Sequence, residues 1–98
     1  MKLEWNGVFP AVTTQMKRDG ALDLESTQKG IERLIDGGVR GLVMMGMVGE
    51  NSSLRPDEKL NVLRAALESA RGRVPVLSGV AEFTTAQGAD YARKCEQL

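Results

Sequence analysis

The chain has 98 residues, of which 13 are basic and 13 are acidic, so its formal net charge is zero. This balance gives no excess of positive charge that would bind nucleic acid or a membrane surface, and neither partner is expected. Hydrophobic residues make up 42% of the sequence, as in an ordinary soluble domain, and one globular unit is predicted.

Cellular location is indicated by three further features. The single cysteine, Cys95, excludes an internal disulfide and fits a reducing compartment. No apolar stretch reaches the ~20 residues that a spanning helix requires. The amino-terminal residues 1–5 lack the apolar core of a secretory signal. The sequence therefore predicts a cytoplasmic protein.

The first strand is predicted over residues 7–14, with Pro10 at a strand end, an edge or a bulge because proline donates no ladder hydrogen bond. A polar loop follows over residues 15–22. Asp23 then has the position of a helix cap, and the helix is predicted to end at Gly37-Gly38. Apolar residues at helical spacing predict the buried face of this helix: Leu24, Ile31, Leu34 and Ile35.

A second strand is predicted over residues 39–46, and the next helix starts near Pro56, a residue favoured in the first helical turn. Asp57 and Glu58 fall in that turn, where the helix dipole favours carboxylates. The helix is predicted to end at residues 71–73. Its apolar face consists of Leu60, Leu63, Ala66, Leu67 and Ala70.

A third strand is predicted over residues 74–79, followed by a helix from about Thr84. Thr84 and Gln87 have the spacing of a capping box. The predicted buried face of this helix consists of the short side chains Ala89, Ala92 and Cys95. Strands near residues 7, 41 and 74 are about one βα unit apart, which predicts right-handed crossovers and a parallel sheet.

The rest of the chain is organised around residues 40–53. The apolar run over residues 41–45 has no polar alternation, which is typical of a strand covered on both faces of a parallel sheet. Ligands bind at the carboxyl ends of such strands, where the loop Gly46–Glu50 lies. Gly46 and Gly49 permit backbone torsions closed to other residues, and main-chain amides there could hold an anion. A plain strand-to-helix turn is the alternative.

Three sequence blocks in this order and spacing resemble the dihydrodipicolinate synthase and N-acetylneuraminate lyase family. They are residues 7–13, the loop Gly46–Glu50, and residues 54–58. The resemblance covers nearly the whole chain. It implies a (β/α)8 barrel enzyme, a lyase that joins or splits pyruvate-type substrates through a lysine Schiff base. It also implies no cofactor and a homo-oligomer, either a dimer or a tetramer.

The resemblance implies a substrate-binding role for Gly46, Met47, Val48 and Gly49. In the family the two positions between the glycines usually hold threonine or serine. The first, here Met47, belongs to a proton relay with tyrosines, and the second, here Val48, binds the substrate carboxylate. The main-chain donors are therefore kept while both hydroxyls are lost, which leaves anion binding in place without the relay.

Two further residues have implied supporting roles. Glu50 closes the family motif and is interpreted as bracing the loop, since a carboxylate beside an anion pocket would repel the substrate. Thr13 matches a threonine near the barrel mouth, while Thr14 stands where the family commonly has proline. Ser78, at the end of the third strand, is interpreted as a core-lining residue.

No catalytic lysine is predicted within this chain. Schiff-base chemistry needs a lysine held neutral by desolvation on the inward face of a strand. In the family the lysine and a catalytic tyrosine come from later strands, beyond Leu98. Tyr91 is expected to pack or to face solvent. The chain's lysines are terminal, in a loop or on the solvated faces of helices: Lys2, Lys17, Lys29, Lys59 and Lys94.

A complete barrel needs ~250 residues, so residues 1–98 are predicted to be the first three βα units of one barrel domain. There is no histidine, and no metal site is expected. The function predicted for the complete chain is a Schiff-base lyase in which this segment supplies the carboxylate-binding loop. The alternative is a non-catalytic oligomerising or small-anion-binding module.

Overall fold

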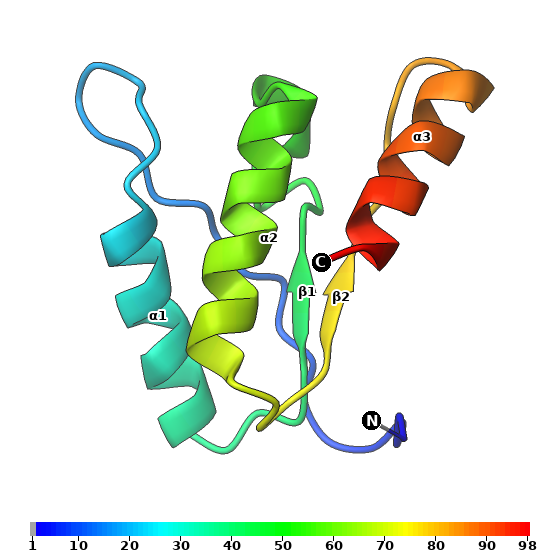
Figure 1. Ribbon diagram of the computed structural model, residues 1–98. Helices are drawn as coiled ribbons and strands as arrows, with labels where there is room; N and C mark the ends of the chain where they lie inside the picture. Colours follow the sequence, from blue (N-terminus) through cyan, green and yellow to red (C-terminus); the bar gives the residue numbers. More distant parts are fainter. Residues whose placement is uncertain (1) are drawn as a thin grey trace.

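The computed structural model describes residues 2–98, so that Met1, the first residue of the amino-terminal stretch considered above, lies outside the described residues. Helix α2 lies against the strands, with α1 packed on one side of it and α3 on the other (Figure 1). The elements in chain order are α1 (Leu24–Asp36), β1 (Leu42–Met44), a 3-10 turn (Asn51–Ser53), α2 (Pro56–Ala70), β2 (Val76–Ser78) and α3 (Thr85–Glu96).

The predicted parallel pairing is confirmed for the two strands. β1 and β2 are parallel neighbours, with Leu42 opposite Val76 and Met44 opposite Ser78. Their carboxyl ends therefore lie at the same edge of the sheet. Residues 45–53 follow β1 directly at this edge.

The strand predicted over residues 7–14 is reduced to a single parallel bridge between Ala11 and Val43. The segment still runs alongside β1, since the Val12 N–H donates to the Val43 oxygen and the Val43 N–H donates to the Pro10 oxygen, both at 3.0 Å. Pro10 contributes only an acceptor, as expected at an edge. Residues 2–98 thus contain two strands and one segment that pairs with β1, and the count of three βα units is not confirmed.

Helix α1 begins and ends at the predicted residues. The Asp23 carboxylate caps it by accepting hydrogen bonds from the backbone N–H and the hydroxyl of Ser26. These two bonds, the backbone one first, lower the pKa of Asp23. The helix ends at Gly37, and Gly38 follows with a φ of 95°, a left-handed torsion that favours glycine.

Helix α2 starts at Pro56 as predicted, and the Glu58 carboxylate accepts a hydrogen bond from the Arg55 backbone N–H at 3.0 Å. Most of its predicted apolar face is buried or half-buried, but Leu67 is 40% exposed. Leu67 lies outside the stripe of α2 residues that belongs to the buried core. That stripe contains Val62, Leu63, Ala66 and Ala70.

Helix α3 is capped by Thr84, whose hydroxyl accepts a hydrogen bond from the Gln87 backbone N–H. Its predicted buried face is wrong for Ala89 and Ala92, which are exposed, while Cys95 is half-buried. Tyr91 is the buried residue, at 2% exposure. Tyr91 and Cys95 are four residues apart and share one face, and burial of the large aromatic ring decides which face that is.

The core lies between β1 and the helices rather than on both faces of the sheet. Leu42 and Met44 are fully buried, whereas Val43 between them is only half-buried. Successive side chains of a strand point to opposite faces, so one face of β1 is covered more completely than the other. The prediction of a strand covered on both faces is therefore wrong for this chain taken by itself.

Candidate functional site

The loop at the carboxyl end of β1 is bracketed by two residues in the left-handed region, Met45 at φ 57° and Glu50 at φ 60°. Gly46 and Gly49 permit such torsions, but neither has a φ in the left-handed region. A left-handed torsion at a non-glycine residue costs free energy and persists where the surrounding structure fixes it. The strained positions of this loop are thus its two ends.

The role of the two loop glycines is indicated instead by the atoms that surround them. A Cβ on Gly49 would lie 3.1 Å from the Val12 oxygen and 3.2 Å from the Met45 nitrogen. A Cβ on Gly46 would meet nothing within 4 Å. Gly49 therefore allows the loop to lie close to the first segment, while Gly46 faces open space that a ligand could enter.

Gly79, at the end of β2, approaches the same loop even more closely, because a Cβ there would lie 2.5 Å from the Met45 oxygen. We expect Gly79→Ala to force the two loops apart and to lower the free energy of unfolding by about 1 to 3 kcal/mol. Gly46→Ala is the matched control and should leave the stability nearly unchanged. Urea denaturation of both variants tests this, and equal losses would contradict the assigned contact.

Most main-chain donors of the loop Met47–Glu50 have no partner within the protein's described residues. The Glu50 N–H donates to the Met47 oxygen at 2.9 Å and closes the turn. Within residues 2–98, the N–H groups of Met47, Val48 and Gly49 have no hydrogen-bond acceptor. Consecutive unpaired amides in a turn form a concavity that binds anions.

The side chains predicted to line the site are accessible. Met47 is 90% exposed and Val48 is 53% exposed. Glu50 and Thr13 are also exposed, and the Thr13 hydroxyl accepts a hydrogen bond from the Gln15 side chain at 3.0 Å. Among the described residues, the Glu50 carboxylate has no hydrogen bond or ion pair, so its bracing role stays a prediction.

Two buried polar residues, one bonded to the loop and one directly after it, make contacts that the sequence does not predict. Thr14 is 5% exposed, and its hydroxyl donates to the Gly49 oxygen at 2.7 Å. Asn51 is 6% exposed, and its side-chain nitrogen donates to the Ala81 oxygen at 3.2 Å. Both bonds link segments at least 30 residues apart in the sequence, so no local pattern signals them.

Lys59 contradicts the prediction that it lies on a solvated face. It is 3% exposed, and its Nζ lies 3.0 Å from Oε1 of Glu82, whose side chain is 8% exposed. The ammonium also lies 5.7 Å from the centre of the Tyr91 ring. A signal was available in the sequence, since Lys59 stands four residues before Leu63 and seven before Ala66, on the apolar face of α2.

Tyr91 packs in this buried cluster and does not face solvent. Burial raises the pKa of Tyr91 to about 12, although the hydrogen bond with the Ser78 hydroxyl, at 3.5 Å, acts in the opposite direction. The phenol is therefore neutral at physiological pH. Ser78 itself is half-buried and donates to the Gly79 oxygen, in line with the predicted core-lining role.

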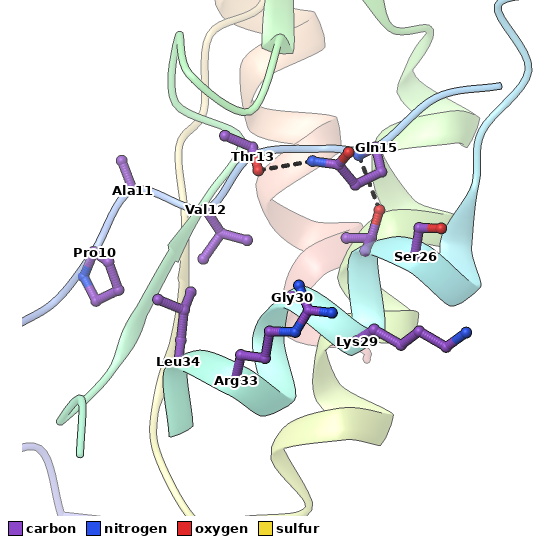
Figure 2. Close-up of a pocket in the computed structure, with 11 residues that line it drawn as sticks. Pro10, Ala11, Val12, Thr13, Gln15, Ser26, Lys29, Gly30, Arg33 and Leu34 are labelled. Atoms are coloured by element: carbon purple, nitrogen blue, oxygen red, sulfur yellow. Dashed lines mark hydrogen bonds between the residues drawn. The ribbon is translucent and has the colours of Figure 1, made fainter. Parts of the chain in front are cut away.

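A separate groove of about 630 Å³ lies between the first segment and α1. Figure 2 shows Val12 and Leu34 facing each other across it, with Arg33 and Lys29 along the helix. It contains no residue of the Gly46–Glu50 loop. In residues 2–98, no helix is long and apolar enough to span a bilayer, and no group of three His, Cys, Asp or Glu residues is placed to hold a metal.

Comparisons with known proteins agree with one another. The dihydrodipicolinate synthetase family profile matches residues 4–98. A 4-hydroxy-tetrahydrodipicolinate synthase from Xanthomonas axonopodis pv. citri is 40% identical over 93 residues, which are 95% of this chain and 31% of the relative.

Solved structures of family members complexed with pyruvate superimpose well. YagE from E. coli K12, a prophage protein of the dihydrodipicolinic acid synthase family, is 33% identical with a TM-score of 0.89, over 95% of this chain and 31% of its own. The chloride-inhibited dihydrodipicolinate synthase from Acinetobacter baumannii is 27% identical with a TM-score of 0.89, over 93% and 31%. This chain thus spans about a third of the proteins it matches.

Proposed function

Because the chain belongs to the dihydrodipicolinate synthetase family, we propose that it forms part of a Schiff-base lyase acting on pyruvate-type 2-oxo acids. In this proposal the loop Gly46–Gly49 binds the substrate carboxylate. The observation that carries it is the set of unpaired N–H groups of Met47, Val48 and Gly49 at the carboxyl end of β1. Two family members that superimpose on the chain are complexed with pyruvate.

The side chains between the two glycines differ from the hydroxyl residues that are usual in the family. Neither Met47 nor Val48 carries a hydroxyl, so the carboxylate would be held by backbone amides alone. The proton relay assigned by resemblance to the Met47 position cannot run through a thioether. Met47 is instead proposed to line a pocket for a more apolar or bulkier substrate.

The proposed nucleophile lies outside these residues. Within residues 2–98, no lysine lies on β1 or β2, and the one buried lysine, Lys59, is engaged in an ion pair with Glu82. Residues 1–98 are therefore proposed to be the leading part of a single (β/α)8 barrel domain of ~250 residues. The groove beside the first segment would then be filled by a later element of the barrel.

The remaining properties proposed for the complete protein come from the sequence and the family resemblance. It would act in the cytoplasm as a homodimer or homotetramer and would require no cofactor. The loop Gly46–Glu50 would keep its carboxylate-binding role in that assembly, with Glu50 and Thr13 as supporting residues.

Borohydride trapping tests the proposal. The complete protein, incubated with pyruvate and borohydride, should carry one reduced pyruvate adduct by mass spectrometry. The 98-residue chain alone should show neither the adduct nor lyase activity, because it has no lysine on a strand. A stoichiometric adduct on a lysine of the short chain would contradict the proposal. Pyruvate binding by the complete protein without any adduct would favour a non-catalytic anion-binding module.

A further inference from the structure

We propose that Thr14 is a positioning residue, whose hydroxyl holds the anion-binding loop in the turn that leaves the amides of residues 47–49 unpaired. The inference about substrate affinity rests on the proposed function, whereas the inference about loop geometry does not. Thr14 touches the loop through one strong contact, the 2.7 Å hydrogen bond from its Oγ1 to the Gly49 oxygen.

Thr14 is itself held firmly on both sides. Two residues before it, the Val12 N–H donates to the Val43 oxygen of β1 at 3.0 Å. Directly after it, the Gln15 N–H donates to the Thr27 hydroxyl of α1 at 3.0 Å. The Thr14 side chain is 5% exposed. The hydroxyl is therefore a fixed donor, presented to the loop by β1 and α1.

The bond acts on a single peptide plane of the loop. The Gly49 carbonyl and the Glu50 N–H belong to one planar unit. Thr14 binds the carbonyl, while the Met47 oxygen accepts from the Glu50 N–H at 2.9 Å. Both polar ends of this peptide are thus fixed, and rotation of the plane would break two hydrogen bonds, one of them buried.

Rotation of this peptide would have a driving force in the absence of Thr14. Glu50 is held at φ 60°, a torsion unfavourable for a residue with a side chain, and a rotated peptide could relieve it. The rotation would also exchange the directions of the two polar groups, so that the Gly49 oxygen would face the Met47 oxygen in place of the Glu50 N–H. The two oxygens would repel each other, and the turn that presents the amides of residues 47–49 to the substrate would change shape.

The test uses the full-length protein, three variants of Thr14 and one control variant in the core. Thr14→Val removes the donor and keeps the shape, Thr14→Ser keeps the donor, and Thr14→Ala is a second variant without it. Val62→Ala is the control, because Val62 is fully buried on α2 and its side chain forms no hydrogen bond with Thr14 or the loop. The readouts are KM and kcat for pyruvate and backbone hydrogen exchange over residues 46–51.

Thr14→Val and Thr14→Ala should raise KM for pyruvate about 10-fold while kcat changes less than about 2-fold. Hydrogen exchange over residues 46–51 should accelerate in both variants. Thr14→Ser should stay near the parent protein in both readouts. Val62→Ala should lower the melting temperature and leave KM and the exchange of the loop unchanged.

Equal effects of Thr14→Val and Val62→Ala on KM would overturn the proposal, as would loop exchange that does not respond to Thr14→Val. If the parent protein has no affinity for any 2-oxo acid, the proposed function fails and hydrogen exchange alone decides the role of Thr14. Faster exchange confined to the Thr14 variants without a hydroxyl then supports it, and unchanged exchange overturns it.

Discussion

Replacing Lys59 with methionine is expected to lower the free energy of unfolding by about 3 to 5 kcal/mol. The Lys59 ammonium lies 3.0 Å from the Glu82 carboxylate, and the two side chains are only 4% and 8% exposed. Methionine fills a similar volume but carries no charge. The variant therefore leaves the Glu82 carboxylate buried without a partner, and the desolvation of that charge is the main cost.

Two controls separate this desolvation from lost packing. Lys59→Met combined with Glu82→Leu removes both charges and should recover most of the stability. Lys94→Met removes a lysine whose Nζ lies 2.9 Å from the Asp90 carboxylate, with both side chains 52% exposed, and should change the stability little. Urea denaturation at neutral pH gives the comparison. A loss for Lys59→Met no larger than that for Lys94→Met would show that burial does not set the strength of this ion pair.

Replacing Val48 with threonine in the complete protein is expected to tighten pyruvate binding about 10- to 150-fold, since a hydroxyl hydrogen bond to a carboxylate contributes about 1.5 to 3 kcal/mol. Valine and threonine have nearly the same shape, so packing should change little. Turnover should not rise, because Met47 still occupies the position of the relay residue. Changing both residues to threonine should shift activity toward the standard reactions of the family. Calorimetric titration with pyruvate and steady-state kinetics measure the two effects.

Val80→Thr is the matched control for Val48→Thr. Val80 is 51% exposed, close to the 53% of Val48, and lies in the loop after β2 outside residues 46–49. It should leave the affinity for pyruvate unchanged. If Val48→Thr alters the affinity for none of the 2-oxo acids tested, the carboxylate of the substrate binds elsewhere than at Gly46–Gly49.

The buried residues around the site show where sequence reasoning failed. Lys59 was expected in solvent because lysine is rarely buried without a partner, and its partner Glu82 is 23 residues away in the sequence. Thr14 donates to Gly49, 35 residues later in the sequence, and Asn51 donates to Ala81, 30 residues later. No periodicity or cap can indicate such pairs, because they depend on which loops meet at the carboxyl edge of the sheet.

Features that rest on interactions within a few residues follow from the sequence alone. The caps at Asp23 and Thr84, the helix start at Pro56 and the helix end at Gly37-Gly38 all lie where predicted, because each is a local bond or torsion. The order of the sequence blocks also identified the family, and the alternation of elements predicted parallel strands.

The choice of buried helix faces and of strained torsions depends instead on tertiary contacts. Tyr91 rather than Ala89 and Ala92 is buried on α3, because the space beside β2 and Lys59 accepts a large ring. The strained torsions of the loop fall on Met45 and Glu50, while Gly49 serves the close approach to Val12. Burial and strain depend on contacts between segments far apart in the sequence, and those distances exist only once the chain has folded.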